Sequence, residues 1–342
     1  MEKQILVSGG LGFIGYHLCK RLLETEPDSR IVVVDNLSST QLDFSDLIGR
    51  ITILTTDFRT MSDDMGIFNE VYHLASPVGS LGILEKYGYI AQEILALAEK
   101  AARIASHSGA RLLYVSSSEV YGRDGRFQES AEQIVPCKRG ARMEYALAKL
   151  TAEHVLLNLA EEGAFELRIV RPFNAMGEWQ SSAIGFVIPK FFESALSGQE
   201  LQIFGTGQQV RSFCHVLDLV NGIIQVQAKG RLNNIYNIGH PDSVIRIEEL
   251  ALAIVRLCNS SSTLQYVDPV SLYGNRYIEA FDKVPDIAKA IADTGWRPSI
   301  SLSNGLERIL NHYRARAIKN ARQPTVSGHS SSELGNDRAY CH

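Results

Sequence analysis

The chain contains 342 residues, 45% of them hydrophobic, so it can bury one large core or a core with a smaller lobe beside it. Its formal net charge of -4 lacks the basic excess of nucleic-acid-binding proteins, and we expect no nucleic acid as a partner. No apolar run approaches the roughly 20 residues that span a bilayer, and residues 1–8 lack the pattern of a secretory signal. We therefore expect a soluble, cytoplasmic protein with no membrane partner.

The cysteines are widely spaced and form no paired C-x-x-C arrangement. This spacing supports neither a zinc site nor a disulfide framework, so we expect reduced thiols and no metal. The five cysteines are Cys19, Cys137, Cys214, Cys258 and Cys341.

Strand-like and helix-like segments alternate through the first half of the chain. A short apolar strand at 5–7 precedes a glycine-rich turn and apolar residues at helical spacing from Ile14 to Leu23. Residues 31–34 form an uninterrupted β-branched run, typical of a strand buried on both faces of a parallel sheet. Further strands are predicted at 51–54, 70–74, 111–115 and 167–170, and helices at 83–107 and 143–159. The alternation predicts an α/β fold with a Rossmann-type, doubly wound parallel sheet.

The simple alternation ends after Pro172. Segments 186–196, 201–204, 216–227 and 247–257 are separated by turns that contain glycine or proline, which predicts a smaller mixed α/β lobe. Ligands of open α/β sheets bind beyond the carboxyl ends of the strands, so the groove between the two parts is the expected site.

This organisation predicts two domains and a tail. We expect residues 1–172, with part of 205–240, to bind a dinucleotide, and residues 173–316 to form mainly the substrate-binding lobe. Residues 319–342 are polar, small and aperiodic, which predicts a disordered tail.

A dinucleotide fingerprint joins the first strand to the first helix. Gly9, Gly12 and Gly15 occupy its three glycine positions, and Phe13 and Ile14 open the helix whose N-terminus would face pyrophosphate. Asp35 ends the second strand, where its carboxylate would accept hydrogen bonds from the adenosine ribose and repel a 2′-phosphate. The pattern favours NAD over NADP, and a role for Asp35 in capping the turn is the alternative.

Other residues that follow the strands are expected to line the same cofactor site. Asp57 could meet the adenine edge or could cap a turn, and His73 is as readily explained as a structural residue. The remaining predicted contacts are Asn36, Phe58, Leu74, Ala75, Ser76 and Pro172.

The motifs together resemble one enzyme family. The glycine fingerprint, HLAS at 73–76, SSSEVYG at 116–122 and Tyr145-Ala-Leu-Ala-Lys149 are similar to the extended short-chain dehydrogenase/reductase family. Its members include nucleotide-sugar epimerases, dehydratases and decarboxylases, and the similarity covers nearly all of residues 1–313. The resemblance implies an NAD-dependent enzyme whose substrate is a nucleotide-diphosphate sugar, with a UDP-sugar favoured.

The Tyr-x-x-x-Lys pair is the expected catalytic centre. Its spacing places Tyr145 and Lys149 on one helical face, where the lysine would stabilise a tyrosinate that accepts a proton from a sugar hydroxyl. Both residues are also expected to contact the cofactor. The resemblance implies that Ser117 hydrogen-bonds the reacting hydroxyl while hydride passes from sugar C4 to NAD.

Glu119 is the fourth predicted catalytic residue, and an ion-pair role is its alternative. A glutamate at this position is similar to the sequence of the UDP-glucuronate decarboxylases and the 4,6-dehydratases, in which an acid/base can act once C4 is a ketone. The dehydratases typically have an aspartate before this glutamate. This chain has Ser118 there, which we assign to the substrate site and which disfavours dehydration.

The resemblance also assigns residues of the second lobe to the sugar nucleotide. Asn174 lies in a segment like the family's RxxN, and Arg211 and Arg276 are candidates to bind the diphosphate. The similar decarboxylases carry an arginine in the segment that matches residues 184–188, and this chain has none there.

The overall motif similarity places decarboxylation of UDP-glucuronate first, 4-epimerisation second and 4,6-dehydration third. A non-enzymatic NAD-binding scaffold or sensor is the alternative from another class, because a fold alone does not certify chemistry. A homodimer formed through the helices at 83–107 and 143–159 is expected from the resemblance.

Overall fold

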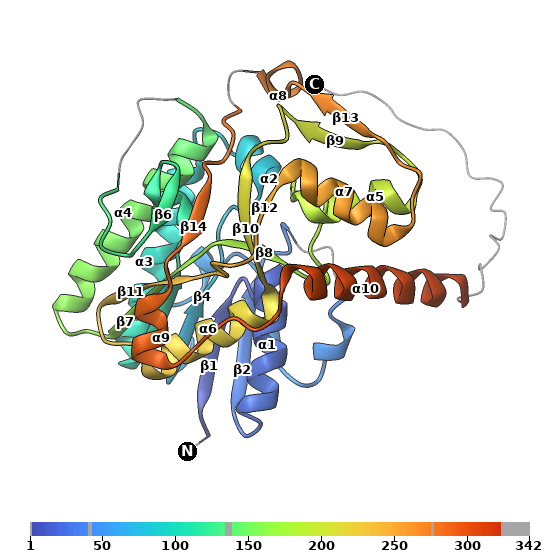
Figure 1. Cartoon of the computed structure of the whole chain (residues 1–342). Coiled ribbons are helices and arrows are strands. Elements are labelled where there is room, and N and C mark those ends of the chain that lie inside the picture. The colour runs from blue at the N-terminus through green and yellow to red at the C-terminus, as the bar shows by residue number, and fades with distance from the viewer. Residues whose placement is uncertain (1, 40–42, 134–138, 275–276, 323–342) are drawn as a thin grey trace, which may run out of the picture.

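The computed structural model describes residues 2–39, 43–133, 139–274 and 277–322. Cys137, Cys341, Arg276 and residues 323–342 of the predicted tail lie outside the described residues. Within them, a large parallel sheet carries helices on both faces, and a smaller lobe stands beyond one end of it (Figure 1). The predicted fold class is confirmed.

Seven strands form the main sheet, in the order β11-β7-β5-β4-β1-β2-β3. Every neighbouring pair is parallel. The strand order reverses on either side of β1, and open α/β sheets bind ligands at such a switch point. The strands are β1 (Gln4–Ser8), β2 (Arg30–Asp35), β3 (Thr52–Thr55), β4 (Glu70–His73), β5 (Arg111–Val115), β7 (Glu166–Pro172) and β11 (Asn234–Ile238).

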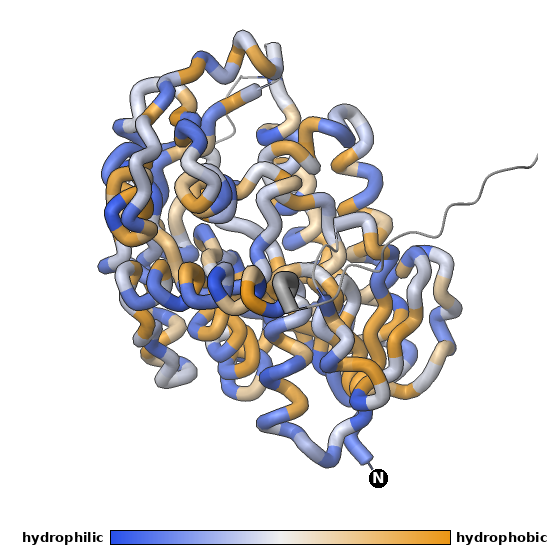
Figure 2. The backbone as a smooth tube through the Cα atoms, turned by 90° about the vertical axis from the view of Figure 1, so that its right-hand side faces the viewer, coloured by the Kyte–Doolittle hydropathy of each residue, from blue (hydrophilic) through white to orange (hydrophobic). Residues whose placement is uncertain are grey.

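Helices cover each face of this sheet and bury its β-branched and aliphatic side chains. On one face α3 (Ile90–Ser108) and α4 (Ala141–Glu161) pack against each other and on the strands, and α1 (Phe13–Thr25), α6 (Val216–Lys229) and α9 (Ala288–Thr294) cover the other. Hydrophobic and hydrophilic stretches alternate along the outer helices (Figure 2), as expected for helices with one buried face.

The helix predicted at 83–107 is two helices. The short α2 (Ser80–Glu85) ends before Lys86, and α3 begins at Ile90. Gly88 lies between them with φ +88°, a conformation that favours glycine and interrupts the helix. The sequence pattern did not resolve this break because the apolar residues on either side continue at helical spacing.

Among the described residues, the smaller lobe is built from short sheets and four helices. Its core lies between α5 (Val187–Leu196), α7 (Ile247–Cys258) and α10 (Leu302–Arg322). The last helix runs past Lys319, where the sequence predicted the tail to begin. The lobe's strands are β8 (Asn174–Met176), β9 (Leu201–Phe204), β10 (Val210–His215), β12 (Val244–Arg246) and β13 (Leu264–Val267), and α8 (Pro269–Tyr273) follows β13.

One strand pair joins the two halves of the chain. β6 (Gly125–Phe127), which follows the fifth strand of the main sheet, pairs in parallel with β14 (Lys283–Pro285) from the end of the second half. This pairing brings residues near 119 and near 283 together, although they are far apart in sequence.

Candidate active site

A cavity of about 840 Å³ lies beyond the carboxyl ends of the central strands, between the sheet and the smaller lobe. Every residue that the sequence assigned to the cofactor lines it, as do the four predicted catalytic residues and Ser118, Asn174 and Arg211. The fold therefore brings all the described site residues to one cavity. Arg276 lies outside the described residues.

Two glycines of the glycine-rich turn lie so close to backbone atoms that a side chain would not fit. Gly9 adopts φ +72°, and a Cβ there would lie 2.7 Å from the Ala75 nitrogen. A Cβ on Gly15 would lie 2.2 Å from the Gly9 oxygen, so helix α1 can approach the turn only without one. Gly12 is the N-cap of α1 and Phe13 is its first residue, and both face the cavity. A helix N-terminus held open to a cavity in this way is suited to a phosphate group.

Asp35 lies at the end of β2 and is 8% exposed. Its Oδ2 accepts a hydrogen bond from the Leu11 backbone at 2.9 Å, and its Oδ1 accepts one from the Leu37 backbone at 2.8 Å. The carboxylate thus anchors the glycine-rich turn and also borders the cavity. Each oxygen keeps a second lone pair that a ribose hydroxyl could use.

Asp57 and His73 both have structural roles. Asp57 accepts from the Arg59 backbone as the cap of the short helix Phe58–Thr60, and it also borders the cavity. His73 is 1% exposed, hydrogen-bonds Ser8 at 2.6 Å and stacks between the rings of Phe58 and Tyr114. Burial lowers the pKa of His73 to about 3, so this ring is neutral and belongs to the core beneath the site.

Tyr145 and Lys149 lie on one face of α4 and both line the cavity, with Lys149 Nζ 6.0 Å from the Tyr145 ring centroid. Burial raises the pKa of Tyr145 to about 12, while its hydrogen bond with Ser117 and the charge of Arg142 act to lower it. The pKa of Tyr145 is thus raised, whereas the sequence predicted that Lys149 would lower it, because burial outweighs the effect of the nearby charges. Deprotonation of Tyr145 therefore needs additional positive charge.

Lys149 has a defined position beside the tyrosine. Its Nζ donates to the Val115 carbonyl at 3.0 Å and lies 4.9 Å from the Tyr114 ring centroid. Burial lowers the pKa of Lys149 to about 7, and the charge of Glu153 acts in the opposite direction. A lysine with this pKa can change its charge near neutral pH.

Glu119 lies between two cations. Its Oε1 accepts from Lys283 Nζ at 3.1 Å and lies 3.3 Å from Arg142 Nη1, while Oε2 is buried and has no hydrogen-bond partner among the described residues. Burial would raise the pKa of Glu119, but Lys283 and Arg142 outweigh burial and lower it to about 2. Glu119 is thus an ionised acceptor in an ion-pair cluster and not a proton donor at neutral pH.

Asn174 and Arg211 border the cavity from the smaller lobe. The Asn174 side chain donates to the Ser212 carbonyl at 3.1 Å. Arg211 pairs with Glu279 at 2.5 Å and with Asp282 at 3.0 Å, and both acidic side chains are 41% exposed. Arg211 is therefore in place to meet an anion in the cavity, in competition with two solvated carboxylates.

Comparison with known proteins identifies the family. A family model described as NAD dependent epimerase/dehydratase family matches residues 5–239. The chain belongs to this family. It is thus an NAD-dependent enzyme that modifies a nucleotide-linked sugar, as the sequence predicted.

Two curated relatives match over almost their full length. The chain is 31% identical over 323 residues to UDP-glucuronic acid decarboxylase 3 of Arabidopsis thaliana, covering 92% of this chain and 90% of that protein. It is 29% identical over 320 residues to UDP-N-acetyl-alpha-D-glucosaminuronate decarboxylase of Bacillus cytotoxicus, covering 92% and 98%.

Solved structures share the fold. UDP-glucose 4-epimerase of Thermotoga maritima, solved with UDP-glucose, superposes with a TM-score of 0.80 at 24% identity, covering 92% of this chain and 99% of that one. UDP-glucuronic acid 4-epimerase of Bacillus cereus, solved with NAD, gives 0.75 at 22% identity, covering 92% and 99%. The family fold therefore extends over both the main sheet and the smaller lobe.

The described residues fit the cofactor of this family. The glycine-rich turn has no room for a Cβ at Gly9 or Gly15, and Asp35 has free lone pairs at the end of β2. Among the described residues, no group of three or more histidine, cysteine or acidic side chains could hold a metal ion. In the same part of the chain, none of the helices combines the length and apolarity needed to cross a bilayer.

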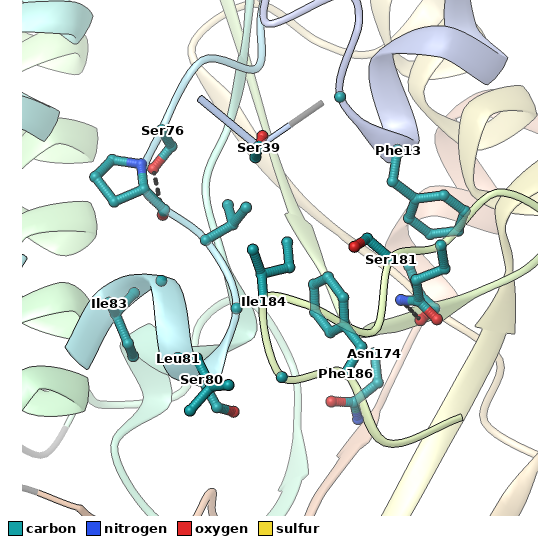
Figure 3. A pocket seen from close by; sticks show the side chains of 18 of the residues that line it. Phe13, Ser39, Ser76, Ser80, Leu81, Ile83, Asn174, Ser181, Ile184 and Phe186 are labelled. Carbon is teal, nitrogen blue, oxygen red and sulfur yellow. Dashed lines mark hydrogen bonds between the residues drawn. The ribbon is translucent and has the colours of Figure 1, made fainter. Parts of the chain in front are cut away.

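The segment at 184–188 places apolar side chains at the site. Figure 3 shows Ile184 and Phe186 projecting between the start of α2 and Asn174. The Leu81 backbone donates to the Ile184 carbonyl at 3.2 Å, and Gly79 and Gly185 lie so close to the opposite segment that neither has room for a Cβ. The loop before α2 and the 184–188 segment thus form one wall of the cavity.

The site residues Arg142 and Lys283 were not predicted from the sequence. Arg142 precedes Tyr145 by one helical turn, and this spacing could have placed it on the same face. Lys283 belongs to none of the motifs described above, and the pairing of β6 with β14 helps to bring it to Glu119.

Proposed function

We propose that the enzyme decarboxylates a UDP-linked uronic acid, with UDP-glucuronate as the first candidate, through a transient 4-keto sugar. The observation that carries the proposal is the ionised Glu119 with its two cations beside Tyr145 and Ser117, in a chain similar to two decarboxylases over 92% of its length. Glu119 supplies an acceptor for a sugar hydroxyl, and the cations favour an acidic substrate.

The roles of the chain's own residues follow from their positions. As a tyrosinate, Tyr145 takes the proton of the C4 hydroxyl, and Ser117 hydrogen-bonds that oxygen. Lys149 and the positively charged nicotinamide of bound NAD would together supply the charge that the tyrosinate requires. The glycine-rich turn and Asp35 would hold NAD, which would supply the acceptor for the C4 hydride and the donor for its return. A carboxylate on C5 of a 4-keto sugar is a β-keto acid, so its bond to C5 breaks without a further protein nucleophile and carbon dioxide leaves. The electron pair passes into an enolate across C4 and C5, and C5 takes up a proton from solvent before hydride returns to C4.

A second reaction, 4-epimerisation, is favoured by the 184–188 segment. Ile184 and Phe186 line the cavity where the similar decarboxylases carry an arginine for the substrate carboxylate. A site without that arginine could accept a sugar that has no acid group. The same Tyr145 chemistry would then return hydride to the opposite face of C4 and leave the sugar's mass unchanged.

Mass spectrometry of the products separates these reactions. The purified protein is incubated with NAD and, in turn, with UDP-glucuronate, UDP-N-acetylglucosaminuronate, UDP-glucose and dTDP-glucose, with Tyr145→Phe as the matched control. A product lighter by carbon dioxide supports the proposal. An isomer of unchanged mass supports epimerisation, loss of water supports dehydration, and no conversion of any sugar contradicts the enzyme proposal for this panel.

We also propose a homodimer formed through α3 and α4. These helices pack on each other, and Tyr89 before α3 and Leu147 and Leu159 of α4 are exposed, at 71%, 41% and 36%. Symmetric association would cover these apolar side chains. Light scattering of the wild type and of Leu147→Glu tests this, and a monomeric wild type contradicts it.

A further inference from the structure

Three charged side chains gather at one end of the cavity. Arg142 Nη1 lies 3.3 Å and Lys283 Nζ 3.1 Å from the same oxygen of Glu119. The side chains of Glu119, Arg142 and Lys283 are 13%, 11% and 3% exposed, and the first two line the cavity. Little water therefore reaches these charges, so they interact strongly with one another and with a bound group.

The cluster holds more positive than negative charge. It contains two cations and one carboxylate among the described residues, and only Oε1 of that carboxylate contacts the cations. The neighbouring Arg211 pairs with Glu279 and Asp282, but these acids are 41% exposed and their charges are screened by water. An anionic group of the substrate would balance the excess charge in the buried part of the cavity.

Arg142 has unused hydrogen-bonding capacity toward the cavity. Its Nε donates to the Ile278 carbonyl at 2.9 Å, its Nη1 faces Glu119, and its Nη2 lies 3.4 Å from Ser80 Oγ. A guanidinium group has five N–H bonds, so these contacts with described residues leave two of them for a ligand. The planar fork of an arginine suits the two oxygens of a carboxylate.

The position of Arg142 relative to Tyr145 matches the geometry of a hexuronic acid. Arg142 lies three residues before Tyr145 on α4, and residues at this spacing are neighbours on one helical face. In the sugar, the carboxylate carbon is bonded to C5, which is the neighbour of C4. A side chain one helical turn from the residue that binds the C4 hydroxyl is thus able to reach the carboxylate.

We propose that Arg142, supported by Lys283, binds the C6 carboxylate of the sugar and is the residue that selects a uronic acid. The inference rests on the proposed function, since it assigns the C4 hydroxyl to Tyr145. It explains how the site can recognise an acid although residues 184–188 contain no arginine. The carboxylate-binding cation then comes from the start of α4 and not from the segment before α5.

Binding measured without turnover tests the assignment. NAD-loaded Tyr145→Phe protein is titrated by calorimetry with UDP-glucuronate, UDP-glucose and UDP, alone and with Arg142→Gln or Arg142→Lys. Arg139→Gln is the matched control, because Arg139 is exposed, precedes the same helix and does not line the cavity. We expect the parent protein to prefer UDP-glucuronate over UDP-glucose by about tenfold to a hundredfold, the range for a charge-assisted hydrogen bond.

Arg142→Gln should bring this preference close to one while the affinity for UDP stays unchanged. Arg142→Lys should keep part of the preference, and Arg139→Gln all of it. The proposal is overturned if the parent shows no preference, if Arg142→Gln keeps it, or if both Arg142 variants lose UDP binding. If the product proves to be an isomer while the preference for UDP-glucuronate still depends on Arg142, decarboxylation is refuted but the assignment of the carboxylate to Arg142 stands.

Discussion

The ion pair between Glu153 and Arg171 lies inside the sheet domain, next to the proposed catalytic lysine. The two side chains are 1% and 2% exposed, and the carboxylate accepts from Arg171 Nε at 2.9 Å and from Nη2 at 2.6 Å. Ser116 also donates to Glu153. Glu153 lies one helical turn after Lys149 on α4 and raises the pKa of that lysine. We predict that Glu153→Gln lowers both the stability of the fold and the charge of Lys149.

The expected loss of stability follows from the burial of the pair. Glutamine leaves the Arg171 charge buried without a counter-charge, and breaking a buried pair in this way costs about 3–5 kcal/mol. The double variant Glu153→Leu/Arg171→Met should recover much of this loss, because neither charge then remains buried. Without Glu153 the pKa of Lys149 should fall below its present value of about 7, so the lysine becomes mostly neutral at neutral pH.

Urea-induced unfolding followed by circular dichroism measures the free energy of unfolding of each variant. Glu24→Gln is the matched control, because it breaks a 2.9 Å pair with Arg21 in which the glutamate and the arginine are 59% and 41% exposed. That change should cost about 1 kcal/mol or less. If Glu153→Gln costs no more than the control, the buried pair does not stabilise the fold as argued. If the double variant is no more stable than the single one, the uncompensated Arg171 charge is not the cause.

Three further changes test the site and the core beneath it. Gly15→Ala should abolish NAD binding, because its Cβ would lie 2.2 Å from the Gly9 oxygen, and calorimetry showing wild-type affinity would contradict this. Asp35→Ala should weaken NAD binding about tenfold or more, and an unchanged affinity would mean that the carboxylate only anchors the turn. The pKa of His73 falls from 6.5 to about 3 on folding, so the unfolded state binds more protons between these pH values and stability is lost as pH falls through this window. His73→Gln should reduce that dependence by up to about 1.4 kcal/mol per pH unit, which urea unfolding at several pH values within the window measures.

The cofactor half of the site could be predicted because short stretches of sequence determine it. The glycines must stand where no Cβ fits, and Asp35 must end a strand buried by its neighbours. Both requirements appear as local patterns at 5–15 and 31–35. The break at Gly88 and the helical residues after Lys319 were not predicted, because local periodicity alone does not show where a helix is interrupted or extended by packing.

The sugar half depends on contacts between distant segments. Glu119 lines the cavity, where the sequence predicted a site residue. Its ionised state, however, depends on Lys283, which approaches it where β6 pairs with β14. No pattern near residue 119 contains this information. The contacts with Lys283 and Arg142 lower the pKa of Glu119 to about 2, so the residue predicted as an acid/base is ionised at neutral pH and cannot act as the acid there.

The ionised state of Glu119 at neutral pH bears on the choice between decarboxylation and epimerisation. If this residue cannot donate a proton at neutral pH, the two reactions do not differ by a protein acid at that position. After oxidation at C4, a carboxylate on C5 is able to leave as carbon dioxide whereas a hydroxymethyl group stays, so decarboxylation requires that the site select an acidic sugar. A cation such as Arg142 that recognises the acid would then be necessary for decarboxylation, and the orientation of the bond between C5 and the carboxylate in the cavity would decide whether carbon dioxide leaves before hydride returns to C4.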